Sequence, residues 1–283
     1  MSPVWYAAGV GVRRGWTELR QTFTTGQDVF GYVLWTILLL VPLFLLRDDP
    51  LEGAALSTGA FMLPSMLGMT LAFTGMMTTA QLLATEREDG TLLRAKAVPH
   101  GMVGHLVGKI VMVSGTALAS MALPFAVGVF LVDGVARQGG GALLTLVWVV
   151  PLGLLATLPA GAVIGSLVSS PRAVGLLMLP VMGLIVISGI YFPLSELPEW
   201  LQIVGQIFPV YWLGLGLRSA LLPADAVTAE IGDSWRHLET VGVLGAWAVV
   251  GLLVAPAVLR RMARRESGAA MAERHRKAMQ RVA

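Results

Sequence analysis

Residues 85–99 read TEREDGTLLRAKAVP, and four residues in a row in this stretch, from Glu86 to Asp89, are charged. The surrounding chain is apolar: of 283 residues, 55% are hydrophobic and only 13% are charged, and the mean hydropathy is +0.74. A soluble domain carries about 25% charged residues. The composition therefore predicts a membrane protein that crosses the bilayer several times, with this charged stretch between two of its spans.

Six apolar runs approach the length of about 20 residues that a transmembrane helix needs. Outward from the charged stretch, they are residues 57–83, 103–132, 29–46, 142–168, 174–190 and 241–259. Several contain proline, which neighbouring helices in a membrane tolerate because they satisfy the freed backbone groups. We expect an all-α membrane protein with six transmembrane helices.

Lysine and arginine favour the cytoplasmic side of a membrane. With both termini inside, 16 of the 20 basic residues are cytoplasmic, whereas ten of the 17 acidic residues lie outside. The charged stretch is then cytoplasmic. Residues 260–283 form a basic cytoplasmic tail that could bind anionic lipid or a partner, or simply anchor the topology.

The region of residues 1–28 precedes the membrane domain of residues 29–259. Four apolar residues of this region share one helical face: Val12, Trp16, Leu19 and Phe23. This pattern predicts an amphipathic helix on the inner membrane surface, and an ordinary basic flank is the alternative. The first apolar run is too long for the core of a cleaved signal peptide, so we expect it to stay as an anchor.

The sequence lacks the patterns that usually mark a catalytic or cofactor site. The chain has no cysteine, and its nearest approach to a phosphate-binding loop, GHLVGKI from Gly104, has the wrong spacing. The four histidines show no metal-ligand spacing, and no run has an ionisable residue near its middle, as ion-coupled pumps usually do. We expect neither an enzyme nor a cofactor or metal on this chain.

The charged stretch also carries the start and stop signals of a short helix. Gly90 can end the preceding helix, Thr91 can cap a new one, and Pro99 stops it. The leucines would face a partner, and the basic residues would pair with acids or phospholipid. These residues are Leu92, Leu93, Arg94 and Lys96. The alternative is a solvated loop with helical propensity.

This stretch, followed by Pro99 and by Gly108–Lys109, resembles the cytoplasmic loop of ABC-type-2 export permeases. In that family a charged segment ending in Gly-Thr-Leu-x-x-Arg leads into a coupling helix, which docks in a groove of a separate ATPase subunit. The resemblance implies that coupling to the ATPase involves Glu86, Arg87, Glu88, Gly90, Thr91, Leu92 and Arg94. Ala95–Lys96 departs from the pattern, because many relatives continue with apolar residues there.

A second stretch, SGIYFPLSELPEWLQIVGQIFP at residues 188–209, interrupts the apolar pattern before the last run. Its prolines and interfacial tryptophan predict a re-entrant segment on the outer side, with an amphipathic surface loop as the alternative. It resembles the same family, in which it helps to gate the exit. The matching residues are Gly189, Phe192, Pro193, Leu197, Pro198, Trp200, Leu201 and Pro209, and Arg218 fits the closing basic position.

The second apolar run carries threonines at a helical repeat, with methionine and phenylalanine beside them. A flexible surface of this kind suits a bulky amphipathic ligand, because thioethers repack easily. The predicted substrate path consists of Met66, Thr70, Phe73, Thr74, Met77 and Thr78. Helix packing is the alternative, and for Gly161 and Gly165 in the fourth run packing is the expected role.

The resemblance implies the permease subunit of an ABC exporter of the drug-efflux-like branch, in the bacterial inner membrane. The permease would be a dimer of this chain or of this chain and a paralogue. Two copies of a separate ATPase would bind the ATP and Mg. The substrate would be an amphipathic drug- or lipid-like molecule; a permease for a polysaccharide or another envelope polymer, and a non-transporting scaffold or sensor, are the alternatives. Nothing indicates nucleic-acid binding.

Overall fold

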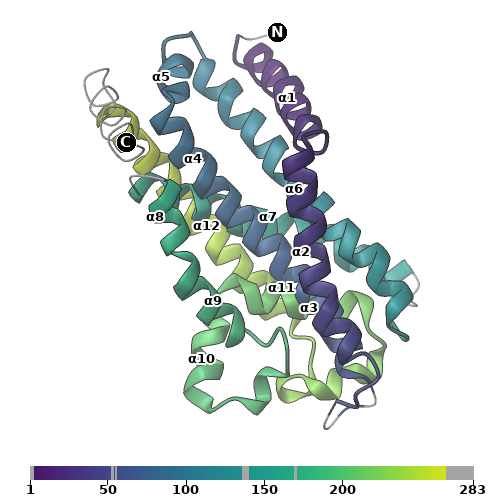
Figure 1. Cartoon of the computed structure of the whole chain (residues 1–283). Helices are drawn as coiled ribbons and strands as arrows, with labels where there is room; N and C mark the ends of the chain where they lie inside the picture. The colour runs from purple at the N-terminus through teal and green to yellow at the C-terminus, as the bar shows by residue number, and fades with distance from the viewer. Residues whose placement is uncertain (1–2, 52–53, 55, 136–139, 169–170, 266–283) are drawn as a thin grey trace.

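A computed structural model describes residues 3–51, 54, 56–135, 140–168 and 171–265, which form an all-helical fold (Figure 1). Five helical segments within these ranges are long and apolar enough to cross a membrane. They are α2 (Gly26–Leu45), the continuous segment from α3 (Thr58–Phe73) to α4 (Thr79–Glu88), α6 (Gly101–Leu131), α7 (Gly140–Leu167) and α12 (His237–Arg265). The expected all-α membrane fold is therefore confirmed.

The second span lies at the centre of the molecule and is the most buried of the five. Between α3 and α4 its backbone widens into one π-helical turn, η1 (Thr74–Thr78). Gly161 and Gly165 of α7 lie against this span: a Cβ at Gly161 would come within 2.2 Å of the Met76 carbonyl oxygen, and one at Gly165 within 2.6 Å of the Ala80 carbonyl oxygen. The two glycines of α7 therefore serve helix packing, as predicted.

The predicted fifth span, residues 174–190, is not one long helix. It forms α8 (Pro171–Leu176) and α9 (Met178–Val186), and the chain turns at Gly189, whose φ is +62°. A left-handed backbone of this kind suits glycine. The helical residues of this run are therefore fewer than the roughly 20 that a membrane-spanning helix needs.

The chain after Gly189 returns toward the protein interior. A short turn, η2 (Leu194–Glu196), leads to α10 (Glu199–Ile207), which meets α11 (Pro209–Leu221) at an angle of 89°. α11 is buried along nearly its whole length. The two helices make a sixth crossing only if they are taken as one broken span. The turns η3 (Ala224–Ala229) and η4 (Ile231–Asp233) connect them to α12.

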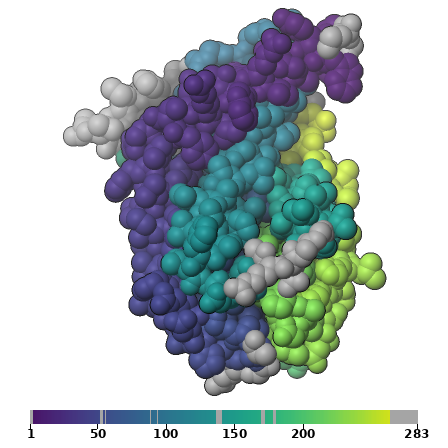
Figure 2. All heavy atoms as spheres, turned by 90° about the vertical axis from the view of Figure 1, so that its right-hand side faces the viewer, coloured from purple at the N-terminus to yellow at the C-terminus, as the bar shows by residue number. Residues whose placement is uncertain are grey.

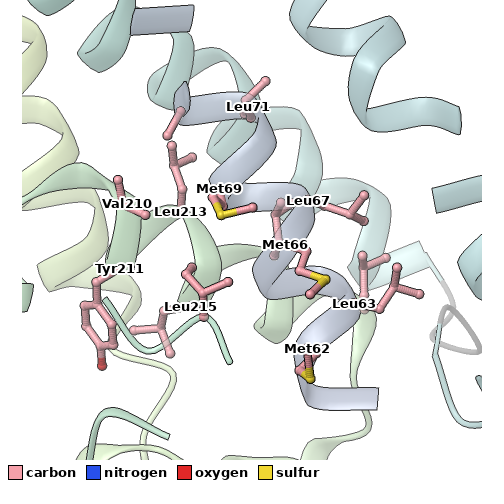
Figure 3. Close-up of a cluster of buried hydrophobic side chains, with 14 of the residues drawn as sticks. Met62, Leu63, Met66, Leu67, Met69, Leu71, Val210, Tyr211, Leu213 and Leu215 are labelled. Carbon is pink, nitrogen blue, oxygen red and sulfur yellow. The ribbon is translucent and has the colours of Figure 1, made fainter. Parts of the chain in front are cut away.

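The largest cluster of buried side chains joins α3 to α11. Figure 3 shows methionines and leucines of α3, among them Met66 and Met69, facing Leu213 and Leu215 of α11. Gly68 allows the two backbones to approach, because a Cβ there would lie 2.7 Å from the Gly214 nitrogen. α11 is therefore held in the protein interior by packing against the central span.

Two short or amphipathic helices gather at the end of the molecule opposite α10. α1 (Pro3–Thr22) and α5 (Thr91–Lys96) lie there, together with the end of α12 (Figure 1). Seen from the side, α1 runs across this end of the molecule as a purple ridge (Figure 2). The predicted helix in residues 1–28 and the predicted short helix after Gly90 are therefore both present.

Candidate coupling segment and membrane path

The start of α5 is fixed by Asp89 and Gly90. The Asp89 carboxylate accepts a hydrogen bond from the Thr91 backbone N–H at 2.8 Å, and Gly90 has a φ of +75°. The predicted capping role of Thr91 is wrong, because Thr91 already lies inside the helix and its hydroxyl accepts from Arg94 Nη2 at 2.9 Å. The Asp–Gly pair forms the turn between α4 and α5. An aspartate side chain readily accepts a hydrogen bond from the backbone N–H two residues later, and glycine tolerates a positive φ.

Glu86 joins α4 to α6 and, through a lysine, to α1. Its side chain is buried, and its two oxygens lie 2.9 Å from His105 Nε2 and 2.8 Å from Lys109 Nζ. Lys109 also donates to Glu18 of α1 at 2.7 Å, and Arg14 donates to the same carboxylate at 2.7 Å. A chain of charged side chains therefore links three helices directly beside α5.

Arg87 ties the end of α4 to a different helix. Its guanidinium donates to the backbone carbonyl oxygens of Ser166 at 3.2 Å and Val168 at 2.9 Å. These carbonyls lie at the carboxyl end of α7, where helical carbonyls lack partners within the helix and the helix dipole favours a cation. Glu86 and Arg87 thus point in different directions and connect α4 to its neighbours on both sides.

The leucine face of α5 is partly internal. Leu92 is 6% exposed and packs in a cluster with Leu83 of α4 and Met262 of α12. The expectation that Leu92 faces a partner is therefore wrong. Its side chain packs inside the chain and anchors α5 to the spans. Arg94 is exposed, and the side chains of Glu88 and Leu93 lie outside the described part of the chain.

A groove of about 650 Å³ runs between α1, α5 and the first turns of α6. Tyr6 and Arg14 line it from α1, and Thr91 and Arg94 line it from α5. Two positive side chains therefore border a partly apolar groove at this end of the molecule.

The glycines of GHLVGKI pack α6 against α1, a role that was not predicted. A Cβ at Gly11 would lie 2.2 Å from the Gly104 carbonyl oxygen, and one at Gly15 would lie 2.3 Å from the Gly108 carbonyl oxygen. α1 and α6 thus pack backbone to backbone through two GxxxG patterns, one on each helix. The signal is present in the sequence, in GVRRG and GHLVG, but the prediction for α1 rested on its apolar face alone.

Only part of that apolar face packs on α6: Leu19 lies against Gly115. Val12 and Trp16 are 47% and 64% exposed, whereas Gly11 and Gly15 are buried. The placement of this face on the inner membrane surface stays a prediction.

Glu18 offers a test of the contact between α1 and α6. Burial opposes ionisation of its carboxyl, but the hydrogen bonds from Lys109 and Arg14 outweigh it and lower the pKa of Glu18. Lys109 bonds to the ionised form of Glu18. The pair therefore stabilises the docking of α1 fully at pH values above the ordinary glutamate pKa of about 4.3. This stabilisation is lost as the pH falls through the lowered pKa.

A ¹³C NMR titration of the Glu18 carboxyl should therefore have its midpoint below about 4.3. In Lys109→Met the midpoint should rise, since burial is then opposed by Arg14 alone. Lys96→Met, a change at an exposed lysine of α5, is the control and should leave the midpoint where it is. An unchanged midpoint in Lys109→Met would show that Lys109 does not hold Glu18.

At the other end of the molecule, Arg218 of α11 organises the second motif. Its side chain is fully buried and forms a two-point ion pair with Glu230, whose carboxylate accepts from Nη2 at 3.1 Å and from Nε. Nη1 donates to Ser65 Oγ at 2.8 Å and to the Gly189 carbonyl oxygen at 3.1 Å. The guanidinium also lies over the Phe61 ring, 4.5 Å from its centre. Arg218 therefore connects α11, α3, the turn after α9 and the loop before α12.

The predicted outer-gate residues surround this ion pair unevenly. Gly189 contacts Arg218, and Pro193 and Pro209 are buried. By contrast, Pro198, just before α10, and Trp200 of α10 are exposed. Phe192, Leu197 and Leu201 are half-buried. The structure therefore brings the start and end of the motif together around α11 and leaves its middle on the surface.

The predicted substrate path divides in a similar way. Met66, Thr70 and Met77 are buried within the single chain, and the Thr70 hydroxyl donates to the Met66 carbonyl oxygen at 2.8 Å. Phe73, Thr74 and Thr78 are half-buried. Phe73 stacks on Trp35 of α2, with ring centres 6.0 Å apart. Four of the six residues, from Phe73 onward, lie at or next to the π-helical turn.

Within the described part of the chain, His, Asp and Glu side chains form no group of three or more that could hold a metal ion.

Comparison with known proteins agrees with this arrangement. Residues 31–256 match a family model described as ABC-2 family transporter protein. No curated protein matches the sequence. The family match covers all five long spans and both motifs, apart from the ends of α2 and α12. The chain therefore belongs to the ABC-2 family of transporter proteins, as a membrane subunit that crosses the bilayer several times.

Proposed function

We propose that the chain is the permease subunit of an ATP-driven exporter that moves an amphipathic drug- or lipid-like substrate outward across the bacterial cytoplasmic membrane. The observation that carries this proposal is the attachment of α5. The helix is short and partly exposed, yet Leu92 packs its inner face against α4 and α12. Just before it, Glu86 and Arg87 tie the end of α4 to α6 and α7. A displacement of α5 would therefore move several spans together.

The ATPase would press on α5 from the cytoplasm. Two copies of a separate ATPase would bind ATP and Mg, and the groove between α1 and α5 would receive part of that subunit. Arg14 and Arg94 at its edge favour an acidic contact on the partner. Residues 85–99 and both termini would then be cytoplasmic, as the distribution of basic residues predicts.

The motion would pass along the second span toward the outer motif. α4 continues through the π-helical turn into α3, and α3 bonds to Arg218 through Ser65. π-Helical turns occur frequently at functional sites. Phe73, Thr74 and Thr78 would contribute to a path completed by a second permease copy or a paralogue, and the segment from Gly189 to Pro209 would gate its exit.

Two variants of the coupling segment test this proposal by co-purification of an ATP-binding subunit from native membranes. A side chain at Gly90 is strained, because a left-handed residue costs about 1–2 kcal/mol. Gly90→Val should therefore reduce ATPase activity that depends on the permease several-fold, while Gly90→Asn, which tolerates a positive φ, should retain most of it.

Arg94→Glu should weaken co-purification by reversing the charge at the groove. Arg172→Glu, which changes an exposed arginine of α8, is the matched control. If no ATP-binding subunit accompanies the unaltered chain in mild detergent, the exporter proposal fails.

Two alternatives make different predictions. A polysaccharide permease would need aromatic side chains along its path, yet only 7% of residues are aromatic. A sensor or scaffold would co-purify with a kinase or regulator in place of an ATPase. The identity of the co-purified chain therefore separates the three classes.

A further inference from the structure

A second cavity, of about 360 Å³, lies among α4, α5, α6, α7 and α12, and none of the six predicted path residues lines it. This volume is in the range of small-molecule sites. Its walls are almost entirely apolar, from Leu82, Leu158, Ala162 and Pro256, among others. Leu106, Ile110, Leu155 and Leu252 line it and are also 40–55% exposed, so it opens between the helices that carry them.

The polar side chains of the cavity gather where α4 ends and α6 begins. They include Glu86, its two partners His105 and Lys109, and Lys96 of α5. The cavity thus combines a long apolar part with a charged end at the level where the spans end. A molecule with an apolar chain and one polar head would match both parts.

His105 indicates the chemistry of that head. A carboxylate only accepts hydrogen bonds, so in the neutral ring Nε2 carries the proton that is donated to Glu86, and Nδ1 is an acceptor. His105 is 4% exposed, and no described residue is bonded to Nδ1. A buried acceptor without a donor costs free energy. A head group that donates hydrogen bonds would satisfy it.

The charges favour an amine over a carboxylate. Lys109 already has two carboxylate partners, Glu18 at 2.7 Å and Glu86 at 2.8 Å, so an anionic head would compete with both. Lys96 is exposed, where ion pairs contribute little. An ammonium could instead donate to two buried acceptors. Glu86 Oε1 accepts no hydrogen bond from the described residues, although Lys109 Nζ lies 2.8 Å away, and His105 Nδ1 accepts none either.

We propose that this cavity binds the alkyl chain of a lipophilic amine, with its ammonium head at Glu86 and His105. The inference rests on the proposed export of an amphipathic molecule and names the substrate class. It places a binding site within one chain, at the α4 end of the second span, where none of the six predicted path residues lines the cavity.

Protection of an introduced cysteine tests the proposal directly, because the native chain has none. The full chain carrying Leu155→Cys is purified in detergent, and its modification by N-ethylmaleimide is followed by mass spectrometry with decylamine, decanol or decanoate present. Decylamine should protect at a concentration about tenfold lower than decanoate, a difference of about 1.4 kcal/mol. Decanol should fall between them.

Leu144→Cys is the matched control, because it changes an exposed leucine of α7 that does not line the cavity. None of the three compounds should protect it. Adding Ala162→Phe to Leu155→Cys fills the cavity and should abolish protection, and adding His105→Phe should remove the preference for the amine.

Equal protection by all three compounds, or equal protection of the two cysteines, would overturn the proposal. The head-group comparison needs only Leu155→Cys, a change at a half-exposed side chain, so it does not depend on whether the filled variant folds. The measurement uses the permease without nucleotide or ATPase. Its failure is therefore distinct from a failure of the ATPase to co-purify.

Discussion

Arg218→Met should destabilise the protein by about 3–5 kcal/mol, the cost of removing one partner from a buried ion pair. Glu230, which is 4% exposed, would lose its ion-pair partner, and Ser65 and the Gly189 carbonyl would lose their donor. We expect a fall of several degrees or more in the thermal unfolding midpoint of the protein in detergent. Transport should fall as well, because the turn at Gly189 is no longer held.

Two controls distinguish the effect of losing the ion pair from the effect of losing the volume of the arginine side chain. The double variant Arg218→Met, Glu230→Met removes both charges and should recover much of the lost stability, because apolar residues can replace a buried pair at little cost. Arg236→Met changes a partly exposed arginine, which lies over Trp212 at 4.8 Å, and should have a much smaller effect. If the double variant is no more stable than Arg218→Met, the unpaired charge is not the source of the loss.

The sequence predicted the elements whose signals are local. Composition and run length were sufficient for an all-helical membrane fold and for the five long spans, because hydropathy over about 20 residues decides insertion. α5 was predicted because Gly90 and Pro99 bound it within a few residues. Its true cap, Asp89, was missed because aspartate and threonine compete for the same role and only geometry separates them.

Features that depend on distant residues were not predictable in the same way. Arg218 was placed on the outer side with other basic residues, yet it is fully buried. It bonds to Ser65, 153 residues away, and no pattern in the sequence indicated that contact. The fifth apolar run was assigned one helix because hydropathy does not register the break between α8 and α9. The substrate path was drawn along one helical face, and α11 covers part of that face with Leu213 and Leu215 (Figure 3).

Gly11→Leu should detach α1 from α6, whereas Gly9→Leu, two residues away on the same helix, should not. A Cβ at Gly11 would lie 2.2 Å from the Gly104 carbonyl oxygen, and a Cβ at Gly9 would have no atom within 4 Å. Overpacking of this kind costs about 1–3 kcal/mol, which shifts the docking equilibrium roughly 5–150-fold. Because backbone atoms form both sides of the contact, no rotamer change can relieve the clash.

The position of Leu19 reports this undocking, because its side chain packs against Gly115 of α6. In a Leu19→Cys background, Gly11→Leu should raise the rate of maleimide labelling several-fold, and Gly9→Leu should leave it unchanged. The thermal unfolding midpoint of the spans should move little, since α1 lies at one end of the molecule (Figure 2).

ATPase activity that depends on the permease then decides whether the glycine contact carries function. If it falls with Gly11→Leu while the spans remain folded, α1 moves together with α6 during coupling, and the Glu18–Lys109 bond is the charged part of the same joint. Equal labelling of the Gly9 and Gly11 variants would show instead that the charged pair alone holds α1. Protonation of Glu18 at low pH should then be enough to raise labelling at Leu19→Cys, because the Glu18–Lys109 bond would be the main contact that it removes.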